Sequence, residues 1–139
     1  MTDVVIDTDV ASQLQKGTAP EWVRRQVAQA RVWVTFVTVA ELWKWAEVRS
    51  WGPPRRTRLD AWIAHRPVIP YDAEVARTWG RLAAAAQLRG RPRPQNDTWI
   101  AACCVRYGLP LLTLNQRDFV DFRDHDGLLL PTGGPDDVA

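Results

Sequence analysis

Four carboxylates in this sequence stand beside predicted strands or at predicted helix starts, where they could act together. Asp7 closes the apolar run 4–6, Glu41 lies one turn into a helical pattern, Asp97 opens another, and Asp118 follows the apolar run 111–113. If brought together, these groups would repel one another unless positive charge lay among them. Carboxylate oxygens without His or Cys partners favour Mg²⁺ or Mn²⁺ over Zn²⁺. The chemistry predicted by this set is metal-assisted hydrolysis.

Three of the four acids also have simpler explanations, which the sequence leaves open. The run Thr38–Glu41 fits a capping box, in which the glutamate reaches back to the first N–H of its helix. Asp97 could be an ordinary N-cap or first-turn acid, and Asp118 an ordinary turn residue. Asp7 is harder to explain in this way, because an acid placed after three β-branched residues needs a partner to offset its burial.

The elements that must position these acids alternate along the chain. With 139 residues and 46% apolar composition, the sequence has room for about one domain. Strands are predicted at 4–6, 32–37, 68–69 and 111–113, with a possible edge strand at 128–130. Helices are predicted at 8–14, from Pro20 onward, and at 38–50, 56–64, 72–90 and 96–107. This alternation predicts an α/β fold with a mostly parallel central sheet, whose strands end at one functional edge.

Positive charge is concentrated in the middle of the chain. Residues 51–100 carry nine arginines against four acids, although the net charge of the whole chain is only +2. Arginine binds phosphate through its planar fork, so a phosphate-containing partner is one interpretation. The other is a solvated face rich in Arg for reasons of genome composition. Arg89, Arg91 and Arg93 lie in a loop before Asp97 and are the candidates for contacts with nucleic-acid phosphate or with a carboxylate of a protein partner.

The remaining unusual residues bear on location and partners. The only cysteines, Cys103 and Cys104, are adjacent and cannot form an ordinary disulfide, so they are predicted to be small core residues. No apolar run approaches the roughly 20 residues of a membrane span, and we expect a cytoplasmic protein with no membrane contact. Eight tryptophans exceed what one core needs, so some are expected to line a partner groove, with those near Glu41 as candidates: Trp43, Trp45 and Trp51.

Four segments, in order, resemble the successive motifs of PIN-domain nucleases, and in particular of VapC-type toxins of bacterial toxin–antitoxin pairs. They are Val5-Ile6-Asp7-Thr8, Thr38-Val39-Ala40-Glu41-Leu42, the segment 96–102 beginning Asn96-Asp97-Thr98, and the segment 108–119 ending Arg117-Asp118-Phe119. The resemblance covers about residues 1–130 and implies a PIN-like α/β/α sandwich. It also implies a Mg²⁺- or Mn²⁺-dependent endoribonuclease that is held inactive by a cognate antitoxin, with homodimerisation common. Residues 131–139 are expected to be a flexible tail.

The resemblance also implies residue roles. Asp7, Glu41 and Asp97 match the acidic positions of the family, and Asp118 is taken as the fourth, with Asn115 as a neutral ligand or orienting group. Asp7, Asp97 and Asp118 are predicted to hold the metal, and Glu41 to accept a proton from water or to hold a second ion. Asp9 either caps the first helix or adds a fifth carboxylate. The hydroxyls predicted to support the acids are Thr8, Thr38 and Thr113.

Two other functions fit parts of the sequence. A PIN-like module could bind RNA or protein without cleaving it. Asp7-Thr8-Asp9-Val10 resembles the first motif of haloacid dehalogenase-type phosphatases, but that family needs a late lysine, and only Lys16 and Lys44 exist. His65 and His125 lie far from the motifs and are expected at the surface, which argues against a histidine-pair ribonuclease.

Overall fold

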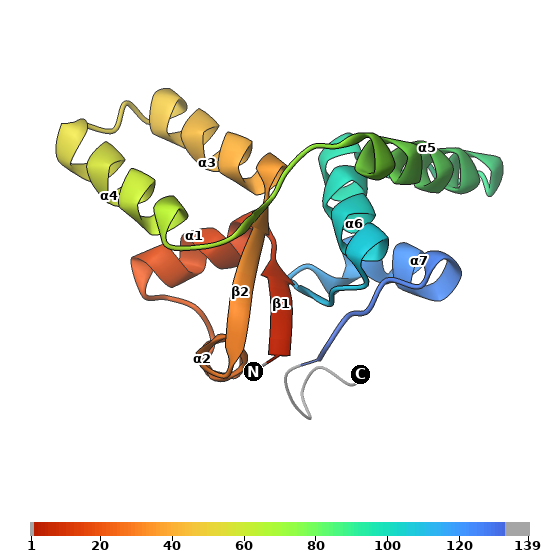
Figure 1. Cartoon of the computed structure of the whole chain (residues 1–139), viewed down its shortest axis with the longest axis horizontal. Helices are drawn as coiled ribbons and strands as arrows, with labels where there is room; N and C mark the ends of the chain where they lie inside the picture. The colour runs from red at the N-terminus through yellow and green to blue at the C-terminus, as the bar shows by residue number, and fades with distance from the viewer. Residues whose placement is uncertain (1, 133–139) are drawn as a thin grey trace.

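The computed structural model describes residues 2–132, which contain a central parallel sheet with helices on both faces (Figure 1). Its strands are β1 (Thr2–Ile6), β2 (Ala30–Thr35), β3 (Val68–Ile69) and β4 (Leu111–Leu112). All pair in parallel, in the order β3-β2-β1-β4. The helices are α1 (Thr8–Lys16), α2 (Glu21–Ala28), α3 (Phe36–Val48), α4 (Pro53–Ala64), α5 (Ala73–Leu88), α6 (Gln95–Tyr107) and α7 (Gln116–Asp126). The predicted α/β class and sheet are confirmed.

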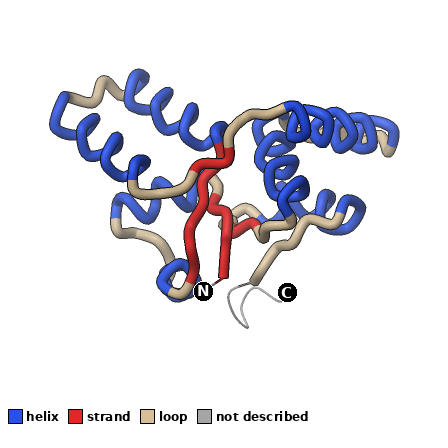
Figure 2. Tube along the Cα trace, viewed as in Figure 1, coloured by secondary structure: helices blue, strands red, loops and turns tan. Residues whose placement is uncertain are grey.

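The alternation of side chains along the strands creates two cores. Val5 of β1 and Leu111 of β4 face α5, α6 and α7, whereas Ile6 and Leu112 face the side covered by α1 to α4. Figure 2 shows the strands between these two groups of helices. Both faces of the sheet are therefore buried, which is usual for parallel sheets.

The boundary between β2 and α3 differs from the prediction. The strand ends at Thr35, whose hydroxyl accepts the N–H of Thr38, and α3 begins at Phe36. Thr38 is thus inside the first turn and is not the cap, so the capping-box explanation of Glu41 is wrong. Thr35 and Thr38 could each cap a helix. The apolar Phe36 and Val37 between them are typical of a strand, so the predicted strand extended two residues beyond the observed end of β2.

The C-terminal part also differs. Helix α7 was not predicted, because its residues are mostly charged and its buried apolar stripe consists of Phe119 and Phe122. The proposed edge strand at 128–130 does not form. Instead, Gly127 ends α7 in a left-handed conformation, and one backbone bond runs from the Leu111 N–H to the Leu129 carbonyl.

Other expectations can be compared directly. Cys103 and Cys104 are buried, and His65 and His125 are exposed, as predicted. All eight tryptophans are half-buried and are divided between the two cores. No helix within residues 2–132 is long and apolar enough to cross a membrane. Residues 133–139, the greater part of the predicted tail, lie outside the described residues.

Candidate active site

The four predicted carboxylates line one cavity of about 120 Å³ at the carboxyl ends of β1 and β4. They arrive there on four different elements: Asp7 directly after β1, Glu41 on α3, Asp97 on α6 and Asp118 on α7. The sheet topology explains this convergence, because parallel strands end at a common edge and each following helix starts there. The cavity is also lined by Thr8, Asp9, Trp45, Ile100, Asn115 and Phe119.

Asp7 is the most enclosed acid of the site, with only 4% of its surface exposed. Its Oδ1 accepts the Val10 N–H at 3.0 Å, which makes it the N-cap of α1, and its Oδ2 accepts the Thr113 hydroxyl at 2.5 Å. Burial raises the pKa of Asp7 to about 6, despite these two hydrogen bonds, which favour the charged form. The capping role considered for Asp9 therefore belongs to Asp7.

Glu41 is held by a hydroxyl from a neighbouring helix, α1. The Thr8 hydroxyl donates to Glu41 Oε1 at 2.7 Å and also lies 3.1 Å from the hydroxyl of Thr38, which is fully buried. These contacts connect α1 to α3 immediately beside Asp7. They fix the orientation of the Glu41 carboxylate, and the supporting roles of Thr8 and Thr38 in catalysis stay predictions.

Asp9 adds a fifth carboxylate to the cavity, and its hydrogen-bond partner is Asn115. The Asn115 side-chain amide donates to Asp9 Oδ2 at 2.7 Å, while the Asn115 backbone N–H donates to the Thr113 hydroxyl at 2.9 Å. The Asn115 side chain therefore orients a carboxylate and makes no capping hydrogen bond to α7. Asp118 lies in the first turn of α7 and faces the same cavity.

Asp97 shows that the acids influence one another. Burial raises its pKa to about 6, with the negative charges of Asp118 and Glu41 adding to the effect. Asp97 occupies the first turn of α6, whose N-cap is Pro94, so it is not a cap residue. A first-turn position near the positive end of a helix dipole would normally favour the charged form. The crowding of carboxylates and the partial burial outweigh that preference.

The loop arginines separate into different roles. The Arg89 guanidinium pairs with Asp121 at 2.8 Å and with Asp126 at 3.6 Å, and so joins the end of α5 to α7. Arg91 is exposed. Arg93 donates to the Asp118 backbone carbonyl at 3.5 Å, and its positive charge partly opposes the rise in the pKa of Asp97. Arg93 therefore acts on the acids directly, whereas Arg89 is engaged in ion pairs with α7.

Sequence reasoning did not assign Trp45, Ile100 and Phe119 to the site. Trp45 follows Glu41 by four residues and Ile100 follows Asp97 by three, so helical spacing could have identified both. Phe119 depends on α7, which was not predicted. Trp43 does not line the cavity, in agreement with its position two residues from Glu41 on another face of the helix.

The donor set fits a hard divalent cation. The cavity is lined by carboxylates, hydroxyl and amide groups, without His or Cys. Burial raises the pKa of both Asp7 and Asp97, and neighbouring negative charges add to the effect, so a bound cation would favour their charged forms. Among residues 2–132, no group of three or more His, Cys, Asp or Glu side chains is placed so that it could hold a metal ion without side-chain movement. This arrangement suits Mg²⁺, which commonly takes one or two carboxylates and keeps several waters.

Comparison with known proteins agrees with this geometry. The PIN domain matches residues 4–126. Ribonuclease VapC5 of Mycobacterium tuberculosis is 32% identical over 128 residues, covering 91% of this chain and 85% of that protein. The DNA-bound VapBC structure from Salmonella typhimurium superposes with a TM-score of 0.79 at 26% identity, covering 94% and 98% of the two chains. VapBC-5 of M. tuberculosis, a member of the VapBC family of toxin-antitoxin systems, gives 0.66 at 28% identity, with the same coverage.

Proposed function

The chain belongs to the PIN-domain family, and from this premise we propose that it is a divalent-metal-dependent endoribonuclease, the toxin of a toxin–antitoxin pair. The observation that carries this proposal is the cavity in which five carboxylates meet and two have raised pKa values. The ribonuclease name of a 32% identical relative supports RNA as substrate. The toxin-antitoxin assignment of a structural neighbour supports an antitoxin partner.

Asp7, Asp97 and Asp118 would hold the metal, which we propose to be Mg²⁺ or Mn²⁺. When bound, such an ion makes water a stronger nucleophile and neutralises charge that develops on the phosphate. Thr113 fixes the Asp7 carboxylate, and Asn115 fixes that of Asp9. Both Asp118 and Asn115 line the cavity. That Asp118 supplies the fourth charge at the metal, with Asn115 as a neutral ligand or orienting group, stays a prediction.

Glu41 is proposed to accept the proton of the attacking water. Its Oε1 is oriented by the Thr8 hydroxyl, so the carboxylate is already in place before substrate binds. The 3′ oxygen of the RNA then leaves, without participation of the 2′-hydroxyl. Arg93, beside Asp97, and the exposed Arg91 are the proposed phosphate contacts of this route.

Two broader features belong to the proposal. An RNA substrate and two buried, unpaired cysteines are consistent with a cytoplasmic location. The homodimer implied by the resemblance stays a prediction, which light scattering of the purified chain would test. The family match covers nearly all of residues 1–130 and leaves the phosphatase alternative without support.

Cleavage assays distinguish the nuclease from a module that only binds. The purified chain should cleave RNA with Mg²⁺ or Mn²⁺, and EDTA should abolish cleavage. Asp97→Asn should lower the rate by at least about 100-fold, because it removes a metal-binding charge. Asp124→Asn, which changes an exposed acid of α7 outside the cavity, should leave the rate unchanged. RNA binding without metal-dependent cleavage would favour the binding module instead.

A further inference from the structure

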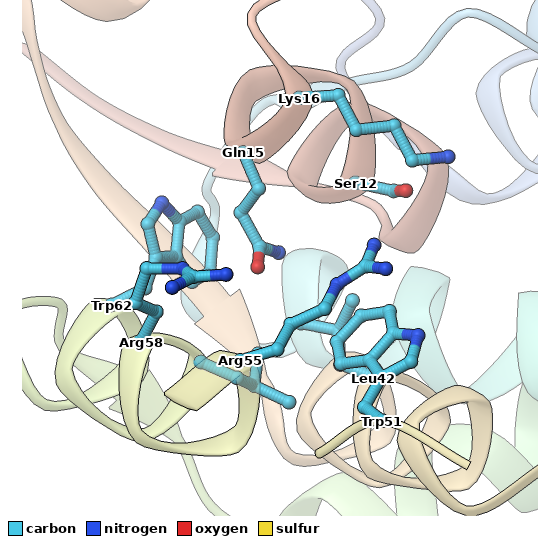
Figure 3. A pocket seen from close by; sticks show the side chains of 9 residues that line it. Ser12, Gln15, Lys16, Leu42, Trp51, Arg55, Arg58 and Trp62 are labelled. Atoms are coloured by element: carbon cyan, nitrogen blue, oxygen red, sulfur yellow. The ribbon is translucent and has the colours of Figure 1, made fainter. Parts of the chain in front are cut away.

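A second cavity, of about 350 Å³, lies between α1, α3 and α4 (Figure 3). Helix α4 presents one face to it, with residues spaced by three or four along the helix: Arg55, Arg58, Leu59 and Trp62. Helix α1 contributes a second wall and α3 a third, with Trp51 in the connection that follows α3. The other lining residues are Ser12, Gln15, Lys16 and Leu42.

The charge of this cavity is entirely positive. Lys16, Arg55 and Arg58 line it, and no Asp or Glu does. Within residues 2–132, none of these three cations takes part in an ion pair. The indole N–H of Trp51 is buried and has no hydrogen-bond partner among the same residues. Lysine, arginine and indole nitrogens only donate hydrogen bonds, so the chemistry of the wall selects an anion.

One arginine of this cavity, Arg55, is held in place before any ligand binds. The Arg55 guanidinium lies 3.7 Å from the centre of the Trp51 ring, and Figure 3 shows it between that ring and the residues of α1. The next residue, Arg56, donates to the carbonyls of Trp51 and Ala46 and pairs with Glu47, which fixes the start of α4 against the end of α3. A preorganised cation loses less conformational entropy on binding.

The cavity and the carboxylate site are lined by different residues of the same two helices, α1 and α3. Thr8, Ser12 and Lys16 follow one another at intervals of four on one face of α1, leading from the acids to the cations. At 1.5 Å per residue, the backbone positions of Thr8 and Lys16 are about 12 Å apart. On α3, Glu41 lines the first cavity, and its neighbour Leu42 lines the second.

We propose that this second cavity binds backbone phosphates of the RNA strand whose scissile bond lies at the carboxylate site. The proposal rests on the nuclease function proposed above and adds a substrate subsite to it. A polyanion that enters a site lined by five carboxylates meets repulsion, and cations about 12 Å away along α1 would offset it within the reach of a few nucleotides. An acidic peptide could also neutralise three cations, and the experiment below therefore compares RNA with such a peptide.

Binding to a short single-stranded oligouridylate tests this subsite without cleavage. The background is Asp97→Asn, and the test variant adds Arg55→Ala and Arg58→Ala. The matched control adds Arg24→Ala and Arg81→Ala, two exposed arginines that do not line the cavity. The test variant should bind about tenfold more weakly, and the slope of log affinity against log salt should fall by about 1.4, at 0.7 for each lost contact. The control should retain the slope, and thermal unfolding should show that both variants fold.

The outcomes separate the subsite from the nuclease. If the test variant and the control bind RNA equally, the subsite is wrong, even if the parent chain cleaves RNA. If the test variant loses RNA affinity while the parent shows no metal-dependent cleavage, the subsite stands and the nuclease proposal fails. If the test variant instead loses affinity for an oligoglutamate peptide and retains its RNA affinity, the cavity is a protein-docking site and the proposal is overturned.

Discussion

At the scale of single residues, the site depends on how Asp7 is held. Its two oxygens accept hydrogen bonds from the Val10 N–H and the Thr113 hydroxyl, yet burial keeps its pKa at about 6. One residue therefore caps a helix and supplies a carboxylate whose charge is costly without a cation. We propose that this carboxylate lowers the stability of the metal-free fold and is retained because it would bind the metal.

Asp97, the other acid with a raised pKa, should make the stability of the metal-free chain depend on pH. The pKa of Asp97 is raised in the folded state, so the folded chain holds this proton more tightly than the unfolded chain does. The resulting contribution to the free energy of unfolding is complete below the ordinary pKa of 3.8 and is lost as pH rises through about 6. Asp97→Asn should therefore stabilise the metal-free chain by about 1–2 kcal/mol at neutral pH and by little at pH 4. Thermal unfolding in EDTA at several pH values measures this, and a stabilisation that does not grow with pH would contradict it.

Thr113 offers a second test at this scale. Thr113→Val preserves shape but removes the donor to Asp7 Oδ2 and the acceptor for the Asn115 N–H. The pKa of Asp7 should rise further, because the charged form loses a hydrogen bond, and the acidic limb of the pH–rate profile should move to higher pH. Thr78→Val, at a buried hydroxyl of α5 that bonds the Glu74 carbonyl, is the control and should leave the profile in place.

At the scale of elements, the fold assigns the acids to four segments that converge on one edge of the sheet. The strands, most helices and the positions of Asp7 and Asp97 could be predicted, because β-branched runs and cap residues carry local signals. The start of α3 could not be located to the residue, since Thr35 and Thr38 are equally suitable caps. Helix α7 lacks a strong apolar stripe in the sequence. It is held by an ion pair with Arg89, the residue that follows α5.

The ion pair that holds α7 gives a prediction at this scale. Asp121→Ala leaves the Arg89 guanidinium, whose side chain is 24% exposed, with Asp126 alone, so we expect a clear loss in the free energy of unfolding. Glu74→Ala breaks the exposed pair with Arg77 and should cost less than about 1 kcal/mol. Urea denaturation compares the two, and equal losses would show that the Arg89 pair does not hold α7.

At the scale of the whole molecule, a net charge of +2 conceals two cavities of opposite charge. Carboxylates meet at one cavity, and another is lined by cations that have no ion pair within residues 2–132. Helix α1 spans both, with Thr8 and Lys16 about 12 Å apart along its axis. The sequence indicated acidic and basic segments, but the meeting of α1, α3 and α4 depends on tertiary packing that no local pattern encodes. Of the predicted loop arginines, Arg89 forms an ion pair with Asp121 and holds α7. The loop arginines are therefore only part of the basic surface, which also includes the cations of the second cavity.

The chemistry of the RNA ends tests the central proposal most directly. RNA cleaved by the purified chain with Mg²⁺ or Mn²⁺ should carry 5′-phosphate and 3′-hydroxyl termini, because attack by water at these carboxylates does not use the 2′-hydroxyl. Mass spectrometry of the fragments identifies the ends. Fragments with 2′,3′-cyclic phosphate would contradict hydrolysis at the carboxylate site.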